Sequence, residues 1–143
     1  ASEDIGLANP NALLIATNTF QAVTMIGYPE AEIVLAQCVT YLACSPKSNA
    51  SYLAIKKAKQ LVRETGDLPV PLHLRNAPTK LMKDMNYGSG YKYSHDFPEN
   101  FAFQEFMPDE ISKKTLYEPQ GNAREKDFRQ KLQNLWRKKY NYD

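Results

Sequence analysis

The sequence of 143 residues predicts a mostly α protein, a helical bundle with one long ordered excursion rich in aromatic side chains. Two observations lead to this class. Apolar residues recur at helical spacing over about residues 10–64 and again near the C-terminus. Residues 86–119 lack that periodicity but carry many Tyr and Phe residues, in which disordered segments are poor. We therefore expect a single domain, residues 1–143, whose excursion packs its rings against the helices.

The first two helices are expected over about residues 10–26 and 29–44. Asn9 is a suitable N-cap before Pro10, and Gly27 is a suitable stop at the end of the first helix. Both helices are apolar around most of their circumference. A helix of this kind is covered from more than one side.

The remaining helices are expected over about residues 48–64, 77–85 and 122–140. The helix over 48–64 is amphipathic, with apolar residues on one arc and basic residues on another. Asn76 is the expected cap of the short helix over 77–85. Short connections between the first three helices favour an antiparallel bundle.

The excursion over residues 86–119 is irregular, with one alternative left open. Alternation over residues 101–106 is compatible with a short strand that pairs with residues 114–117 in a β-hairpin. The glycines at Gly88 and Gly90 favour a tight turn with positive φ.

The sequence contains no residues that point to catalysis, cofactor binding or metal binding. There is no G-x-x-x-x-G-K-[ST] motif to hold the phosphates of a nucleotide. The two histidines, His73 and His95, are too few for a zinc site, which needs about three protein ligands. Cys38 and Cys44 lie on different faces of one helix and indicate small buried residues in a reducing compartment. We therefore expect this chain by itself not to be an enzyme.

The charge is distributed unevenly along the chain. Residues 1–46 contain no Lys or Arg and have a net charge of −4, whereas the remainder has a net charge of +6. Either the first helices are internal, or the second part presents a basic surface to nucleic acid or an acidic partner. Basic residues interleaved with tyrosines suit a single strand, although tyrosines also fill protein cores. The candidate nucleic-acid contacts are Lys56, Lys59, Arg63, Arg75, Lys80, Lys83 and Lys92.

The apolar front half predicts self-association. The first two helices carry more apolar surface than a small bundle easily hides, and such surface usually marks a partner site. A first helix buried inside one subunit gives the same pattern, so both interpretations stay open. The candidate interface residues are Phe20, Val23, Met25 and Tyr41.

Several short motifs follow one another in a specific order over about residues 1–119. They are Asp4-Ile5-Gly6-Leu7-Ala8, Leu35-Ala36-Gln37, Tyr41-Leu42-Ala43, Pro46-Lys47-Ser48-Asn49, Val70-Pro71-Leu72-His73-Leu74-Arg75, Ala77-Pro78-Thr79-Lys80-Leu81-Met82-Lys83 and Tyr87-Gly88-Ser89-Gly90-Tyr91-Lys92-Tyr93. This pattern resembles the C-terminal domain of the RarA/MgsA replication-associated recombination AAA+ ATPases, a family that includes the eukaryotic Werner-helicase-interacting ATPase.

The resemblance implies a non-catalytic C-terminal oligomerisation domain, similar in fold to that of clamp-loader subunits, which assembles a homotetramer. It implies an upstream ATPase module, outside this chain, that uses ATP and Mg. The parent protein is then expected to bind DNA and to act in replication-fork maintenance, recombination and repair, with single-strand-binding protein as a partner. The expected location is the bacterial cytoplasm, in association with the nucleoid. The alternative function is a nucleic-acid-binding helical module that uses the basic second part.

Overall fold

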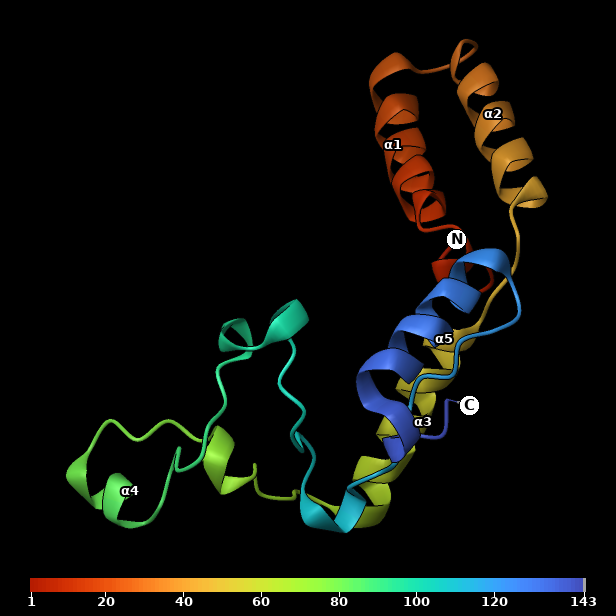
Figure 1. Ribbon diagram of the computed structural model, residues 1–143. Coiled ribbons are helices and arrows are strands. Elements are labelled where there is room, and N and C mark those ends of the chain that lie inside the picture. The colour runs from red at the N-terminus through yellow and green to blue at the C-terminus, as the bar shows by residue number, and fades with distance from the viewer. Residues whose placement is uncertain (143) are drawn as a thin grey trace. The chain divides into compact units, whose positions relative to one another are not determined.

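The computed structural model describes residues 1–142 (Figure 1). Within that range every regular element is helical and none is a strand, so the predicted mostly α class is confirmed. The chain divides into two compact units, each made of two stretches of sequence. Unit 1 comprises Ala1–Gln60 and Leu116–Lys131, and unit 2 comprises Leu61–Thr115 and the residues from Leu132 onward. No helix in the described range is long and apolar enough to cross a membrane.

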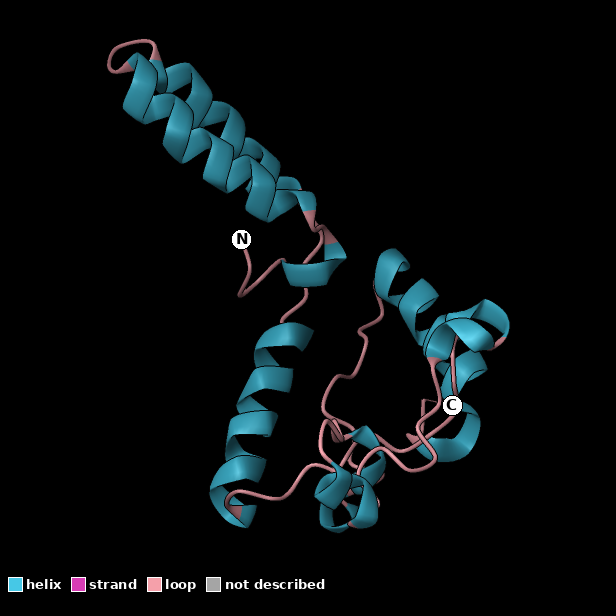
Figure 2. Ribbon diagram, turned by 90° about the vertical axis from the view of Figure 1, so that its left-hand side faces the viewer, coloured by secondary structure: helices cyan, strands magenta, loops and turns pink. Residues whose placement is uncertain are grey.

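The helices α1, Asn11–Ile26, and α2, Ala31–Cys44, pack side by side as a hairpin in unit 1 (Figure 1), and Figure 2 shows the same pair from a second direction. α1 ends at Gly27, whose φ of 75° is a left-handed conformation that glycine adopts without steric cost. The side chains that the hairpin buries are small, namely Ala12, Ala31 and Cys38. The larger apolar side chains of both helices therefore remain wholly or partly accessible.

Asn9 does not cap α1 with its side chain, which corrects the expectation from the sequence. Its amide nitrogen donates instead to Tyr41 Oη and to Ser45 Oγ, both at 3.0 Å. The Tyr41 hydroxyl donates back to the side-chain oxygen of Asn9 at 3.3 Å. The backbone carbonyl of Asn9 accepts from the amide of Ala12, and no side-chain cap is formed. The side chain of Asn9 thus joins the start of α1 to the end of α2.

The start of α3, Ala50–Thr65, is held by the N-terminal segment of unit 1, which contains the 3-10 turn Gly6–Ala8. The amide of Ser48 donates to the carbonyl of Asp4 at 2.7 Å. Gly6 has a φ of 47°, and a Cβ there would lie 2.9 Å from the carbonyl oxygen of Ser48. Both the conformation and the space therefore require glycine at this position.

The helix α5, Ala123–Trp136, begins in unit 1 around a buried carboxylate. Glu125 is 0% exposed, accepts from the Tyr117 hydroxyl at 2.8 Å and also accepts from the Asn122 amide. Burial alone would raise the pKa of Glu125. Hydrogen bonds from Ser48, Tyr117 and Asn122 outweigh burial and hold its pKa below the usual value. This carboxylate is therefore the point at which the chain before α3 and the chain before α5 meet.

Unit 2 is built from short helices joined by irregular chain. Its helix α4 is Lys80–Asp84, and Thr79 caps it by accepting from the amide of Met82 at 3.3 Å. Asn76, the cap predicted from the sequence, lies too far ahead, because the helix begins later than expected. The 3-10 helices of unit 2 are Leu72–Leu74, Ser94–Asp96, Pro98–Asn100, Asp109–Ile111 and Arg137–Lys139.

The optional β-hairpin does not form in the described part of the chain. The segment over residues 101–106 has no helix or strand, and Gln104 donates from its side chain to the carbonyl of Lys92 at 3.3 Å. The second expected strand, residues 114–117, is bonded to the C-terminal part of unit 2 instead, because Thr115 Oγ1 donates to the carbonyl of Tyr140 at 2.8 Å. Contacts with distant residues thus replace the local pairing.

Aromatic rings of the excursion pack around Trp136, at the end of α5, within unit 2. The ring of Trp136 lies edge-to-face with those of Phe101 and Tyr140, with centroids 4.9 Å apart in both pairs. The ring centroids of Phe103 and Phe106 lie 6.0 Å and 6.1 Å from that of Trp136. These distances are typical of favourable aromatic pairs. The cluster explains why a segment without periodicity is ordered.

Candidate functional site

The α1–α2 hairpin exposes large apolar side chains. Two of the four candidate interface residues point outward, since Phe20 is 74% exposed and Met25 is 86% exposed. The other two, Val23 and Tyr41, are partly buried, and the Tyr41 hydroxyl is bonded to Asn9. The structure therefore brings Phe20 and Met25 to the surface of the hairpin and keeps Val23 and Tyr41 partly inside it.

Further apolar residues of the hairpin, which the sequence analysis did not single out, are also exposed. α1 contains no charged residue, and the charge on α2 is confined to Glu32. The absence of charge was the signal in the sequence, but it does not say which residues face outward. The additional exposed residues are Leu13, Leu14, Ile26, Tyr28, Ile33 and Val39. We call these residues, with Phe20 and Met25, the hairpin surface.

The candidate basic residues of α3 lie on an exposed part of the helix. Lys56, Lys59 and Arg63 are all exposed. The ammonium of Lys56 lies 5.6 Å from the ring centroid of Tyr52, a cation–π distance. Tyr52 precedes Lys56 by four residues and so shares its face, which the sequence analysis missed.

The candidate basic residues of unit 2 differ in how accessible they are to a ligand. Lys80, Lys83 and Lys92 are exposed, whereas Arg75 is engaged within the unit. Arg75 donates to a backbone carbonyl at 2.6 Å and to the Tyr87 hydroxyl at 3.1 Å. Its guanidinium also lies 5.0 Å from the ring centroid of Tyr87. Arg75 thus positions Tyr87, and the three lysines are the more accessible cations.

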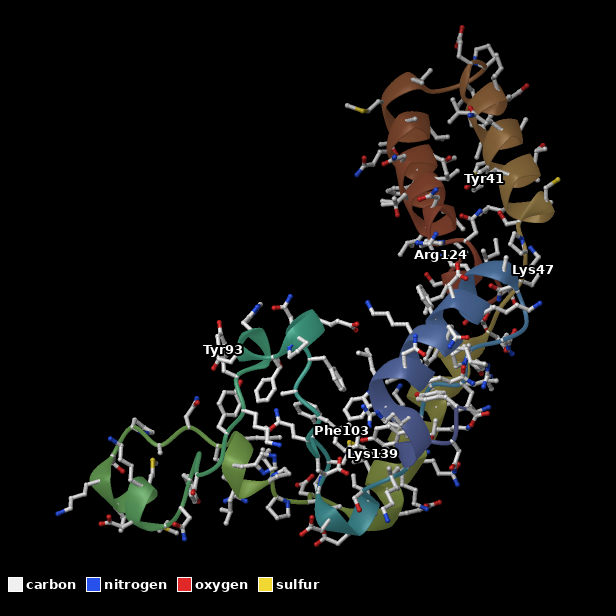
Figure 3. The ribbon with its side chains drawn as sticks, viewed as in Figure 1. Tyr41, Lys47, Tyr93, Phe103, Arg124 and Lys139 are labelled. Atoms are coloured by element: carbon white, nitrogen blue, oxygen red, sulfur yellow. The ribbon has the colours of Figure 1, made fainter. Side chains whose placement is uncertain are left out.

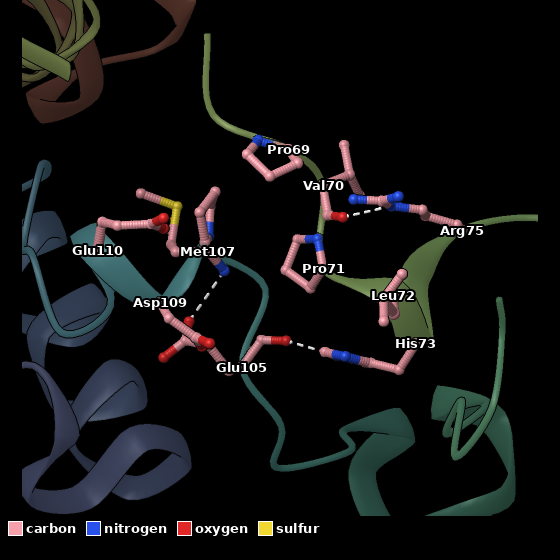
Figure 4. A pocket seen from close by; sticks show the side chains of 11 residues that line it. Pro69, Val70, Pro71, Leu72, His73, Arg75, Glu105, Met107, Asp109 and Glu110 are labelled. Atoms are coloured by element: carbon pink, nitrogen blue, oxygen red, sulfur yellow. Dashed lines mark hydrogen bonds between the residues drawn. The ribbon is translucent and has the colours of Figure 1, made fainter. Parts of the chain in front are cut away.

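A cavity of about 360 Å³ opens beside Arg75 in unit 2 (Figure 4). On one side His73 Nε2 lies 2.8 Å from the carbonyl oxygen of Glu105, and the Glu105 carboxylate accepts from the amide of Met107 at 2.9 Å. Apolar groups form much of the remaining wall. His73 and Glu105 are therefore engaged within the unit, whereas Asp109 and Glu110 are exposed carboxylates at the edge of the cavity. The residues of the apolar wall are Pro69, Val70, Pro71, Leu72, Met107 and Pro108.

The carboxylate of Glu105 is paired with Lys139, which comes from the C-terminal turn of unit 2. Lys139 Nζ lies 3.1 Å from Glu105 Oε2 and donates to the carbonyl of Gln104 at 2.9 Å. The same ammonium lies 4.8 Å from the ring centroid of Trp136 and 5.5 Å from that of Phe103. Figure 3 shows Phe103 and Lys139 close together. The ion pair and the aromatic cluster therefore form one structure.

The pKa values in this cluster are shifted in opposite directions. Burial alone would raise the pKa of Glu105, but two backbone amides and the Lys139 ammonium hold that pKa below its usual value. Burial and the negative charge of Glu105 raise the pKa of the Tyr140 phenol to about 12. Both shifts keep Glu105 charged and Tyr140 neutral near neutral pH. The shifted pKa values of Glu105 and Tyr140 therefore fit a role in the fold, and neither group is poised for proton transfer.

No group of three His, Cys, Asp or Glu side chains within residues 1–142 is arranged to hold a metal ion. His95 is paired locally, with Nδ1 3.2 Å from the side-chain oxygen of Asn100. Its ring lies 5.1 Å from that of Tyr93. Cys38 is buried as expected, whereas Cys44 is exposed, which corrects the expectation that both are buried; both thiols are free.

A family model and several known proteins are similar to this chain over most of its length. The family model described as MgsA AAA+ ATPase C terminal matches residues 1–136. Replication-associated recombination protein A of Escherichia coli strain K12 is 46% identical over 133 residues, which are 92% of this chain and 30% of that protein. The protein of the same name from Coxiella burnetii is 43% identical over 134 residues, 93% of this chain and 30% of that protein. ATPase WRNIP1 of Dictyostelium discoideum is 41% identical over 119 residues, 82% of this chain and 14% of that protein. The chain thus spans less than a third of the length of these relatives.

Proposed function

Because the chain belongs to the MgsA AAA+ ATPase C-terminal family, we propose that it is the non-catalytic oligomerisation domain of its parent ATPase. One observation carries this proposal: the α1–α2 hairpin leaves large apolar side chains on its outside. A contiguous apolar patch of more than a few hundred Å² on the outside of a folded domain usually marks an interface. A second copy of the same chain is an occupant of matching chemistry, because the hairpin surface is apolar and almost free of charge.

A closed homotetramer is the proposed assembly. Identical chains usually associate with closed symmetry, and a tetramer is commonly built as a pair of dimers. A hairpin that packs on its own copy buries the same side chains from both partners. The family resemblance selects the tetramer over the dimer, and in it the domain serves as a helical collar like that of clamp-loader subunits.

The parent protein, in this proposal, binds ATP and Mg in a separate ATPase module and acts on DNA. Its proposed role is replication-fork maintenance, recombination and repair, which the names of the relatives support. The proposed partners are further copies of the chain, DNA and single-strand-binding protein, and the proposed location is the bacterial cytoplasm and nucleoid. The domain contributes assembly to this activity and no reacting group.

Light scattering and sedimentation of the chain at micromolar concentration test the assembly. We expect a tetramer mass for the wild type and a smaller species for Met25→Glu, because Met25 is 86% exposed and a charge there disrupts only an intermolecular contact. Gln21→Glu is the matched control, since it adds the same charge at an exposed position of α1 that is already polar. Circular dichroism checks that both variants remain helical. A monomeric wild type contradicts the proposal.

A second candidate function is nucleic-acid binding by unit 2. One observation favours it: the rings of Tyr91 and Tyr93 are both more than half exposed, and Lys92 stands between them. Stacking platforms beside cations are typical of proteins that bind single strands. The two functions use different residues, because the hairpin surface belongs to unit 1 and these tyrosines belong to unit 2.

A further inference from the structure

A second cavity of unit 2, of about 410 Å³, lies between residues 98–103 and the end of α5. Its wall combines two phenyl rings with aliphatic groups, and its polar groups come from three side chains. A volume in this range suits a small organic group. The lining residues are Pro98, Glu99, Phe101, Phe103, Asn134, Leu135 and Arg137.

The ring of Phe103 is a fixed platform in this cavity. Trp136 lies 6.0 Å away by ring centroids, and the Lys139 ammonium lies 5.5 Å from the Phe103 centroid. Phe103 nevertheless remains 51% exposed, so about half of its surface is free to contact a ligand. Phe101 is held edge-to-face on the same tryptophan at 4.9 Å. The two rings that line the cavity are therefore held in place without a ligand.

Residues with unusual backbone conformations form its rim. Glu99 has a φ of 57° and Arg137 a φ of 53°, and both line the cavity. Asn100, beside Glu99, has a φ of 53°. Non-glycine residues in the left-handed region are strained, and such strain tends to gather where ligands bind. Arg137 supplies a positive charge for a phosphate, and the Glu99 carboxylate is an acceptor for an amino group.

Lys92, in the aromatic and basic segment over residues 91–93, is hydrogen-bonded to the chain at Phe103, which lines the cavity. Lys92 Nζ donates to the carbonyl of Phe103 at 3.4 Å, and the carbonyl of Lys92 accepts from Gln104. Lys92 therefore runs alongside Phe103, with Tyr91 and Tyr93 on either side of it in the chain. A cation, Lys92, thus lies beside Phe103, and its neighbours in the chain, Tyr91 and Tyr93, carry exposed rings.

We propose that this cavity binds one unpaired base of a single-stranded nucleic acid. The base stacks on Phe103, Arg137 binds the adjacent phosphate, and Glu99 accepts from the exocyclic amino group of the base. Neighbouring nucleotides extend over Lys92 and the exposed tyrosines. A duplex is excluded from the cavity because its bases are stacked and paired. The inference rests on the second candidate function and is independent of self-association.

Trp136 makes the test possible without a label, because it is the single tryptophan of the sequence and is in contact with Phe103. The 143-residue chain is titrated with a 15-mer of deoxycytidine, the matching duplex and free dCMP, and the fluorescence of Trp136 is followed. We expect saturable quenching by the 15-mer at micromolar concentration and at least about five-fold weaker binding of the duplex and of dCMP. Binding of the 15-mer that leaves Trp136 unchanged places the site elsewhere and overturns the proposal. Equal affinity for dCMP overturns the assignment to a strand.

Two variants and a matched control locate the site. Phe103→Leu keeps an apolar side chain but removes the ring, and loss of one stacked base weakens binding by about five-fold or more. Arg137→Gln removes the charge at the rim, whereas Arg124→Gln removes the same charge from an exposed position of α5 in unit 1 that is not a candidate nucleic-acid contact. We expect weaker binding for Arg137→Gln than for Arg124→Gln. Equal losses for the two arginine variants, or an unchanged affinity for Phe103→Leu, refute the base site.

Binding failure and assembly failure are distinguishable in the same samples. The mass by light scattering reports the tetramer, and fluorescence reports the oligonucleotide. A monomer that binds the 15-mer supports the base site and contradicts the oligomerisation proposal. A tetramer that binds no oligonucleotide at micromolar concentration supports the oligomerisation proposal and overturns the base site.

Discussion

Replacing Glu125 by Gln tests the contribution of the one carboxylate that unit 1 buries completely among the described residues. The substitution keeps the shape of the side chain but removes its charge. Its remaining carbonyl oxygen still accepts from Tyr117 at 2.8 Å, but the new amide group meets the Asn122 amide, which is also a donor. The hydrogen bonds from Ser48, Tyr117 and Asn122 lose their charged acceptor, and the Asn122 amide loses its partner.

The expected loss in free energy of unfolding is about 2–3 kcal/mol, since a hydrogen bond to a charged group contributes about 1.5–3 kcal/mol and an unsatisfied buried donor adds to the cost. Urea unfolding followed by circular dichroism measures it. Wild type and variant are compared at one protein concentration, because assembly adds to apparent stability. Glu118→Gln is the matched control: Glu118 pairs with Lys57 at an exposed position, where an ion pair contributes about 0–1 kcal/mol.

The pH dependence gives an independent readout of the same carboxylate. The pKa of Glu125 is lowered from 4.5 in the folded state, so its contribution is complete above the unfolded value and is lost as the pH falls through the folded pKa. Glutamine does not titrate. The stability difference between wild type and Glu125→Gln should therefore narrow on acidification below pH 4.5. Two results would refute this role of Glu125. The first is a loss in free energy of unfolding at neutral pH no larger for Glu125→Gln than for Glu118→Gln. The second is a loss for Glu125→Gln that stays the same on acidification.

Lys139→Met keeps the apolar stem against Trp136 but leaves Glu105 without its ion-pair partner at 3.1 Å, so urea unfolding should show a loss of about 2 kcal/mol, within the range for a hydrogen bond to a charged group. Spectrophotometric titration should show that the phenol of Tyr140 ionises only near pH 12, and Glu105→Gln should lower that pKa; a Tyr140 phenol that ionises near pH 10 contradicts the assignment. Calorimetry of the chain with Mg-ATP should show no saturable heat, because the phosphate-binding loop is missing from the sequence, and micromolar binding overturns the non-catalytic role.

The sequence by itself determined the helical class, the approximate extent of the helices and the family. Helical spacing and stop signals such as Gly27 are encoded within a few neighbouring residues, so a short window of sequence is enough to read them. The family is likewise recognised from the order of short motifs up to Tyr93, for which no three-dimensional information is needed. The uncharged front half indicated an interface, but it did not say that Phe20 and Met25 point outward while Val23 is partly covered.

Only the tertiary structure decided the roles of side chains whose partners are distant in sequence. Asn9 has the features of an N-cap, yet its side chain bonds to Tyr41, 32 residues away. Glu125 occupies the first turn of α5, where a solvated carboxylate is common, yet it is buried because Tyr117 and Ser48 reach it. The cavity beside Phe103 exists because the end of α5 returns to a segment more than 30 residues earlier. Periodicity describes which face of an element is apolar, whereas the packing of one element on another is set by contacts that no local pattern contains.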